Sequence, residues 1–341
     1  MNFHDESMAR GAAVLDAEAS TIHQPSPSRL EPLEASRPRV VALDAAELLA
    51  HEFPPQEPLL GPWLRKQTLA MVHAWRGIGK THFALGVAYA VASGGGFLKW
   101  RADKPRKVLY IDGEMPGAAI QERLAAIIAS PDGRPEPPPG YFRIVTPDAQ
   151  EWALPDLATL EGQAAYAAVI GDCEVIVIDN LSALSRTGPE NEGESWIPIA
   201  NWALAMRREG RAVLFVHHEG KNGQQRGSSR REDLLDVVIS LARPSDYREE
   251  EGARFIVKFR KARGLRGGDV EEIEALLAAD ANGVPCWTWR EAAAMDDARI
   301  AELLQLGMTA TDVATEIGCH RSTVYRARTR LEAAGLLPGS V

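Results

Sequence analysis

The sequence has few cysteines, no long apolar run and no excess of basic residues. Its three cysteines, Cys173, Cys286 and Cys319, lie far apart without Cys-x-x-Cys spacing, which argues against a disulfide framework or a cysteine zinc site. No apolar run approaches the roughly 20 residues of a membrane-spanning helix, and the amino terminus lacks the basic-then-apolar order of a signal peptide. These absences predict a cytoplasmic protein with no membrane segment.

The formal net charge of −9 over 341 residues argues against a surface that is basic throughout. Three local basic clusters are nevertheless present, at residues 226–231, 254–266 and 320–330, and each has a plain alternative interpretation as a solvated face. Hydrophobic residues make up 45% of the chain, which is enough for one large core and a small second domain.

The composition predicts three parts along the chain. Residues 1–38 mix small, acidic, proline and serine residues without apolar periodicity, which is typical of a flexible tail. Residues 39–290 alternate short β-branched runs with helix-like runs, which predicts an α/β fold with a mainly parallel sheet flanked by helices. Within them, the Pro- and Gly-rich segment 130–140 predicts a surface connection. Residues 291–341 predict a small all-α domain.

A loop that nearly matches G-x-x-x-x-G-K-[ST] lies between an expected strand and an expected helix. It reads AWRGIGKTH over residues 74–82, with alanine in place of the first glycine. Backbone N–H groups and the positive end of a helix surround phosphates in such loops. A glycine-rich turn with an incidental lysine is the alternative. The residues expected to hold ATP are Ala74, Gly77, Ile78, Gly79, Lys80, Thr81 and His82, with Lys80 on the β- and γ-phosphates and Thr81 on Mg²⁺.

Two further strand-like runs end in carboxylates suited to ATP hydrolysis. The run EVIVIDN, residues 174–180, places Asp179 at the carboxyl end of a strand, where it would hold Mg²⁺. The run VLYIDGEMP, residues 108–116, places Glu114 after a second strand, where it would activate the attacking water. A buried strand followed by a turn aspartate is the alternative for Asp179.

Several of these stretches together resemble one family. Residues 53–64, 74–95, 108–116, 175–184, 216–239 and 258–264 are similar to the RepA-type members of the RecA-like ATPases, which include hexameric plasmid replicative helicases and related phage and mobile-element ATPases. The resemblance implies a RecA-like core, ATP and Mg²⁺ as cofactors, and assembly as a homo-oligomer, expected to be a hexamer. Relatives often carry alanine at the place of Ala74, so that departure from the general pattern fits the family.

The same resemblance implies roles for individual residues. Lys80 and Thr81 would bind phosphate and Mg²⁺, Glu114 would activate water, and Asp179 would be the second Mg²⁺ ligand. His218 matches the polar residue that senses the γ-phosphate, with a histidine that merely ends a strand as the alternative. Lys261 and Arg263, two apart on one expected strand face, resemble the lysine and arginine finger that a neighbouring subunit directs at the γ-phosphate.

The segment 219–233 combines glycine, amides, hydroxyls and arginines with almost no apolar content. That composition suits a loop in the central channel of a ring, where it would hold the phosphates of single-stranded DNA. An ordinary solvent loop is the alternative. The residues expected to bind the strand are Lys221, Arg226, Ser228 and Ser229.

The carboxyl-terminal residues predict three short helices, at 297–307, 308–318 and 321–335, with a basic third helix. The expected inward residues are Ile300, Leu303, Leu304, Val313, Ala314, Ile317, Val324, Leu331 and Ala334, and Ser322 is the expected cap of the third helix. The stretch resembles bacterial helix-turn-helix domains. That resemblance implies that Arg321, Ser322, Thr323, Tyr325 and Arg326 face duplex DNA. A protein-binding three-helix unit is the alternative.

These features together predict an ATP-hydrolysing, ring-forming motor of the replicative helicase type that acts on single-stranded DNA. Two other classes of function remain open at this point. One is an ATP-switched DNA-binding regulator that does not translocate, and the other is a non-catalytic assembly protein that binds nucleotide to form a ring. The presence of both Glu114 and Arg263 weighs against the assembly protein, because a binding module needs neither residue.

Overall fold

The computed structural model describes residues 40–186, 196–218, 230–317, 319 and 321–337. The chain falls into two compact units, which meet in sequence between Phe53 and Pro54. The first unit contains the short helix α1 (Ala45–Ala50), which starts at a capping box. Asp44 Oδ1 accepts from the Glu47 backbone N–H at 2.8 Å, and Glu47 Oε2 accepts from the Asp44 N–H at 2.8 Å. All residues of α1 are exposed.

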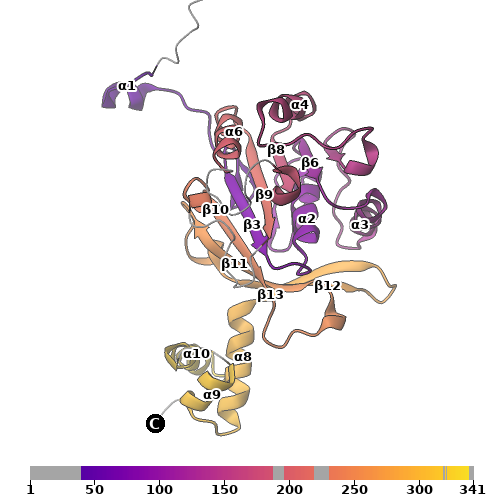
Figure 1. Ribbon diagram of the computed structural model, residues 1–341. Coiled ribbons are helices and arrows are strands. Elements are labelled where there is room, and N and C mark those ends of the chain that lie inside the picture. Colours follow the sequence, from indigo (N-terminus) through magenta and orange to yellow (C-terminus); the bar gives the residue numbers. More distant parts are fainter. Residues whose placement is uncertain (1–39, 187–195, 219–229, 318, 320, 338–341) are drawn as a thin grey trace, which may run out of the picture. The chain divides into compact units, whose positions relative to one another are not determined.

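The second unit is built on a nine-stranded sheet with the order β13-β12-β11-β10-β3-β9-β8-β6-β7 (Figure 1). Six neighbouring strands are parallel, namely β10 (Val237–Ala242), β3 (Leu69–Ala74), β9 (Ala212–His218), β8 (Val175–Asp179), β6 (Val108–Asp112) and β7 (Phe142–Val145). Three antiparallel strands extend one side, namely β11 (Arg254–Ala262), β12 (Ile273–Ala279) and β13 (Pro285–Glu291). The predicted α/β class with a mainly parallel sheet is therefore confirmed.

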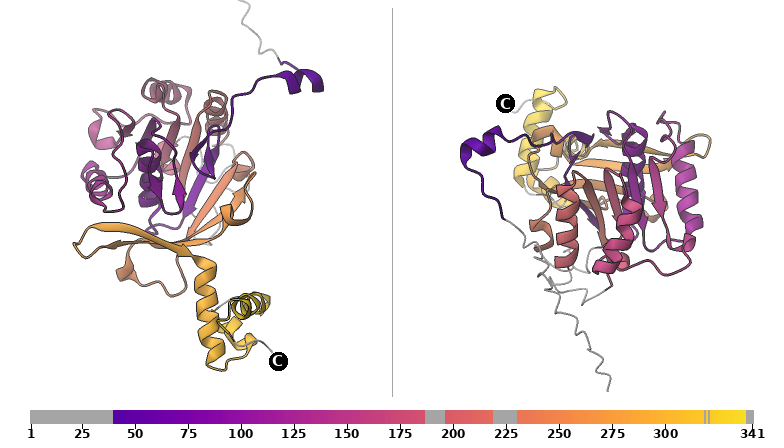
Figure 2. Two further views of the ribbon diagram at one scale, coloured as in Figure 1. Left: turned by 180° about the vertical axis from the view of Figure 1, so that it is seen from behind. Right: turned by 90° about the horizontal axis from the view of Figure 1, so that it is seen from above.

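Helices cover both faces of the parallel strands, as their continuous apolar runs require. Alternate side chains of β3 point to opposite faces, so Ala70 and Val72 lie in one core while Leu69 and Met71 lie in the other. The first core includes α2 (Lys80–Ser93), and the second includes α4 (Leu160–Ile170), α5 (Leu181–Leu184) and α6 (Ile197–Arg208). Figure 2 shows the sheet lying between helices.

Shorter elements complete the described core. Two small hairpins pack beside α2, and a thirteen-residue helix, α3, follows β6. The remaining elements are β1 (Pro58–Leu60), β2 (Leu64–Arg65), β4 (Gly96–Phe97), β5 (Trp100–Arg101), α3 (Gly117–Ala129), α7 (Arg230–Asp233) and the 3₁₀ turns η1 (Pro147–Ala149), η2 (Glu249–Glu251) and η3 (Gly267–Val270). None of the helices in the described part of the chain combines the length and apolar character needed to cross a bilayer.

Three carboxyl-terminal helices, α8 (Ala292–Gln305), α9 (Ala310–Ile317) and α10 (Arg321–Ala333), share a core of their own. Of the predicted inward residues, Ile300, Leu303, Val313, Ala314, Val324 and Leu331 are buried, and Leu304 and Ile317 pack against them. The prediction for Ala334 is wrong, because α10 ends at Ala333 and Gly335, with φ of 71°, turns the chain so that Leu337 is buried instead. Ser322 is not a cap, because α10 already begins at Arg321. The domain boundaries stay predictions.

Candidate nucleotide-binding site

The loop between β3 and α2 is shaped by two glycines in the left-handed region, Gly77 (φ 77°) and Gly79 (φ 119°). A Cβ on Gly79 would lie 3.0 Å from Phe255 Cε1 and 3.2 Å from Ala253 Cβ, so both backbone conformation and space require glycine there. Lys80 Nζ donates to the carbonyl oxygens of Ala74 and Trp75, each at 2.9 Å. The loop thus fixes the lysine at its centre.

A cleft of about 540 Å³ lies against this loop, at the carboxyl ends of β6, β8 and β9. Its lining includes most of the residues predicted from sequence, namely Gly77, Gly79, Lys80, Thr81, His82, Glu114, Asp179 and His218. Ala74 contributes its carbonyl oxygen to Lys80, whereas the side chain of Ile78 is buried in the core beneath the loop. The structure therefore brings the predicted phosphate, Mg²⁺ and water-activating residues into one cleft of a size usual for small ligands.

Asp179 is a buried carboxylate, 4% exposed, that receives two hydroxyl groups. Tyr110 Oη donates to Asp179 Oδ2 at 2.5 Å, and the Thr81 hydroxyl also forms a hydrogen bond with this carboxylate. Burial raises the pKa of Asp179, while these two hydroxyls and the charge of Lys80 act in the opposite direction.

Thr81 and Asp179 offer oxygen atoms, which are the ligands that Mg²⁺ prefers. The described residues contain no group of three or more His, Cys, Asp or Glu side chains that would bind a metal by themselves. The two oxygen donors fit Mg²⁺, since this ion takes one or two protein ligands and completes its shell with phosphate oxygens and water.

Glu114, Asn180 and His218 meet on one side of the cleft. Asn180 Nδ2 donates to Glu114 Oε2 and lies 3.1 Å from His218 Nε2, which itself is 3.6 Å from Glu114 Oε2. Burial and the charge of Lys80 lower the pKa of His218, although Glu114 opposes this shift, so the imidazole is neutral near pH 7. The Glu114 side chain is 62% exposed. The cleft therefore presents a water-accessible carboxylate whose orientation is set by an amide.

Asp112 supports this group from the end of β6. Its side chain is 1% exposed, and its Oδ2 accepts from the backbone N–H of Met115 at 3.0 Å, which orders the turn that carries Glu114. Burial raises the pKa of Asp112 to about 6, with a further contribution from the charges of Asp179 and Glu114.

Lys261 and Arg263 lie near the amino-terminal end of β3, whereas the cleft lies at its carboxyl end. Lys261 Nζ donates to the carbonyls of Glu232 and Asp233 at 2.6 and 3.1 Å, and Arg263 Nη1 lies 3.0 Å from Asp236 Oδ1. Asp236 Oδ2 accepts from the N–H of Leu69, the first residue of β3, at 3.0 Å. The cleft lies beyond Ala74, the last residue of β3. At roughly 3.3 Å per residue, Ala74 is about 17 Å from Leu69.

Arg263 therefore cannot reach the cleft of its own chain. The prediction that Lys261 and Arg263 share one strand face is wrong for Arg263, because β11 ends at Ala262. The predicted strand-binding residues Lys221, Arg226, Ser228 and Ser229 lie outside the described residues.

The predicted duplex-facing residues lie on α10. Arg321, Ser322, Tyr325 and Arg326 are exposed, and Thr323 is half-buried. The Arg321 guanidinium lies 5.3 Å from the Tyr325 ring centroid, and its Nη2 donates to Tyr325 Oη at 2.7 Å. Two other arginines of the helix pair with carboxylates, Arg328 with Glu332 and Arg330 with Asp297. Among the described residues no carboxylate pairs with Arg321 or Arg326, so these two cations are available to phosphates.

Sequence reasoning missed Asn180, which lines the cleft, and Tyr110, which is buried behind the cleft and donates a hydrogen bond to Asp179. Tyr110 precedes Asp112 by two residues and shares its strand face, while Asn180 directly follows Asp179. Both depend on the pairing of β6 with β8, in which Asp112 lies opposite Asp179. The two-residue alternation of VLYID is the one signal that would have placed Tyr110 on the side of the carboxylates.

The sheet, the glycine loop and the carboxylates at the strand ends define a RecA-like P-loop ATPase domain, followed by a helix-turn-helix. The chain belongs to a family described as AAA domain, whose family model matches residues 34–224. A second family model, described as Homeodomain-like domain, matches residues 298–340.

One of the solved structures similar to this chain is that of an archaeal protein. A KaiC-like protein from the hyperthermophilic archaeon Pyrococcus horikoshii is 16% identical in sequence, with a TM-score of 0.46. The match covers 67% of this chain and 93% of the archaeal chain. No curated protein matches the sequence.

Proposed function

We propose that this protein is an ATP-hydrolysing DNA motor of the RepA type, assembled as a ring. The observation that carries the proposal is the meeting of Lys80, the Thr81 and Asp179 oxygens, and the water-accessible carboxylate of Glu114 in one cleft. A protein that only binds nucleotide has no need of a carboxylate held in this way by Asn180.

The residues of the cleft have different roles in hydrolysis. The N–H groups of the loop and Lys80 bind the phosphates, and Glu114 accepts the proton of the water that attacks the γ-phosphorus. Asn180 holds the Glu114 carboxylate, and the neutral His218 lies beside it, where it would sense the γ-phosphate. Thr81 and Asp179 would hold Mg²⁺, which would offset the negative charge of the phosphates.

The position of Arg263 supports the proposed oligomer. Because Arg263 cannot reach its own cleft, a role in hydrolysis requires a neighbouring chain, and a closed ring supplies one neighbour to every cleft. We take that ring to be a hexamer, as in the RepA-type ATPases, with residues 39–290 as the motor and 291–341 as the duplex-binding domain. The 219–233 segment would then face the channel and hold single-stranded DNA.

The test is steady-state ATP hydrolysis by the full-length protein, measured with and without single-stranded DNA. We expect the strand to stimulate the wild type, and we expect Glu114→Gln and Arg263→Ala to abolish the stimulated rate. An ATPase rate that is indifferent to single-stranded DNA and to Arg263 contradicts the motor.

A second candidate is an ATP-switched DNA-binding regulator that does not translocate. It is favoured by the exposed Arg321, Tyr325 and Arg326 on α10, because a motor that follows any strand does not need a duplex-reading helix. This candidate predicts tight, sequence-specific duplex binding that changes with ATP, together with slow hydrolysis that single strands do not stimulate. Duplex binding measured with ATP and with ADP separates the two.

A further inference from the structure

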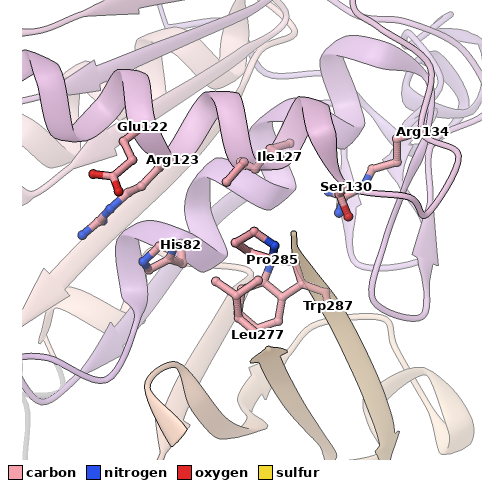
Figure 3. A pocket seen from close by; sticks show the side chains of 10 residues that line it. His82, Glu122, Arg123, Ile127, Ser130, Arg134, Leu277, Pro285 and Trp287 are labelled. Atoms are coloured by element: carbon pink, nitrogen blue, oxygen red, sulfur yellow. The ribbon is translucent and has the colours of Figure 1, made fainter. Parts of the chain in front are cut away.

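A second cavity, of about 250 Å³, lies beside the nucleotide cleft, between α3 and the β12–β13 hairpin (Figure 3). His82 and Arg123 line both the cavity and the cleft, so the two spaces adjoin each other at these side chains. Burial and the charge of Arg123 lower the pKa of His82 to about 4, which leaves the imidazole neutral near pH 7. His82 therefore adds no charge at the boundary between the cleft and the cavity, so a ligand that occupies both spaces is not placed beside a second cation there.

The middle of the cavity is apolar. Ile127 of α3 faces Leu277, Pro285 and Trp287 of the hairpin across the space (Figure 3). The Trp287 ring is held by contacts with Phe97 and Phe255, at centroid distances of 5.6 and 5.5 Å. An apolar slot with a fixed aromatic wall suits a flat, aromatic ligand.

The far end of the cavity is polar, and two of its atoms have no hydrogen-bond partner in the described part of the chain. Ser130 and Arg134 lie at this end, away from His82 and Arg123 (Figure 3). The Arg134 side chain is 6% exposed, and Asp132 accepts from its Nε at 3.0 Å and also from its Nη2. Arg134 Nη1 and Ser130 Oγ, in contrast, are buried without a partner among the described residues.

Unsatisfied buried groups of this kind are costly, and they are rare in folded proteins. Two of them at one end of a cavity indicate that a ligand completes their hydrogen bonds. Arg134 Nη1 offers a donor, and Ser130 Oγ can accept as well as donate. Together they match an edge that presents an acceptor beside an amino group, which is the pattern of the adenine ring nitrogen and its exocyclic amine.

We propose that this cavity binds the purine base of the nucleotide whose phosphates bind at Lys80, and that Arg134 and Ser130 recognise the polar edge of that base. The inference rests on the proposed nucleotide function. The ring packs between Ile127 and Trp287, the ribose passes His82 and Arg123, and the base satisfies Arg134 Nη1 and Ser130 Oγ. The site thereby distinguishes a purine nucleoside triphosphate from a bare polyphosphate.

The test compares two ligands on the full-length protein by titration calorimetry, namely ATP and inorganic triphosphate. Arg134→Met removes the donor while filling a similar volume, and we expect it to weaken ATP binding about tenfold, the usual effect of losing a charged hydrogen bond. Ser130→Ala is expected to weaken ATP binding about threefold, as one neutral hydrogen bond does. Neither variant is expected to change the affinity for inorganic triphosphate, because this ligand has no base that would reach Arg134 or Ser130.

Two controls keep the result interpretable. Arg266→Met makes the same substitution at an exposed arginine that lines neither space, and it should leave both affinities unchanged. Retained triphosphate binding by Arg134→Met shows that the variant has folded and that the loop is intact.

The outcomes separate this inference from the function on which it rests. Unchanged ATP affinity in Arg134→Met overturns the base assignment and leaves the proposed nucleotide function standing. An equal loss for both ligands also overturns it, because the defect then lies in the phosphate site. Failure of the wild type to bind either ligand refutes the proposed nucleotide function and the inference together.

Discussion

Arg254 offers the sharpest test of how the wall of the nucleotide cleft is held. It directly follows Gly252 and Ala253, which line the cleft, and its side chain is 6% exposed. Its guanidinium bonds to Glu274 at 2.6 Å, to Glu251 at 2.9 Å and to Asp246 at 2.9 Å. We therefore consider Arg254→Met, which keeps much of the volume and removes the charge.

The expected loss in free energy of unfolding depends on how well each carboxylate is solvated once the arginine is removed. The side chains of Glu251 and Asp246 are 31% and 63% exposed, so water replaces the arginine. Glu274 is 4% exposed, and among the described residues its remaining cationic partner is Arg290, at 3.2 Å. Removing one partner of a buried ion pair costs about 3–5 kcal/mol, and because Arg290 remains, we expect a value near the lower end, about 3 kcal/mol.

The assay is urea unfolding of the full-length protein followed by circular dichroism, with the loss in free energy taken from the shift of the midpoint. The double variant Arg254→Met/Glu274→Leu removes the stranded charge, and it should recover most of the lost stability. Arg290→Met is the matched control. The Arg290 side chain is 58% exposed, so its loss should cost less than about 1 kcal/mol.

Two results would refute this reasoning. One is a loss below about 1 kcal/mol for Arg254→Met, which would mean that Glu274 is not electrostatically dependent on the arginine. The other is a double variant that is no more stable than Arg254→Met, which would place the cost in packing and not in charge.

Three further predictions concern function. Mixing Lys80→Ala with Arg263→Ala chains, each inactive alone, should restore hydrolysis at about a quarter of sites if Arg263 acts on a neighbouring cleft, and none if it acts in its own chain. Gly79→Ala, with φ of 119° and 3.0 Å to Phe255, should abolish ATP binding in a calorimetric titration while the helical circular dichroism signal persists. Arg321→Ala should weaken duplex binding in fluorescence anisotropy and lower the salt slope by about 1, whereas Arg328, paired with Glu332, should matter less.

The convergence of the predicted site residues in one cleft could be expected from the sequence, for a physical reason. Lys80 and Thr81 lie in a local motif, while Asp179, Glu114 and His218 follow short, β-branched apolar runs that are typical of buried parallel strands. The carboxyl ends of parallel strands meet at one edge of the sheet, so these residues had to converge without any knowledge of strand order.

Residues whose roles depend on strand register or on tertiary packing escaped prediction. Tyr110 reaches Asp179 because β6 pairs with β8. The sequences of the two strands do not show that they are neighbours in the sheet. Arg134 lies in the Pro- and Gly-rich segment that composition marks as a surface connection, yet its side chain is buried. At the helix-turn-helix, periodicity located Val324 and Leu331 correctly, but it cannot show where α10 ends, which is why Ala334 was misplaced.

The separation of Arg263 from the cleft of its own chain, along the length of β3, has a consequence for how such a protein behaves in solution. If Arg263 acts in hydrolysis, an isolated chain has a cleft without its arginine and an arginine without its cleft. The turnover number per chain then depends on the fraction of chains that are assembled with a neighbour. The specific activity then rises with protein concentration and falls on dilution, even under saturating ATP. Under that condition, the concentration of the protein determines its ATPase activity per chain.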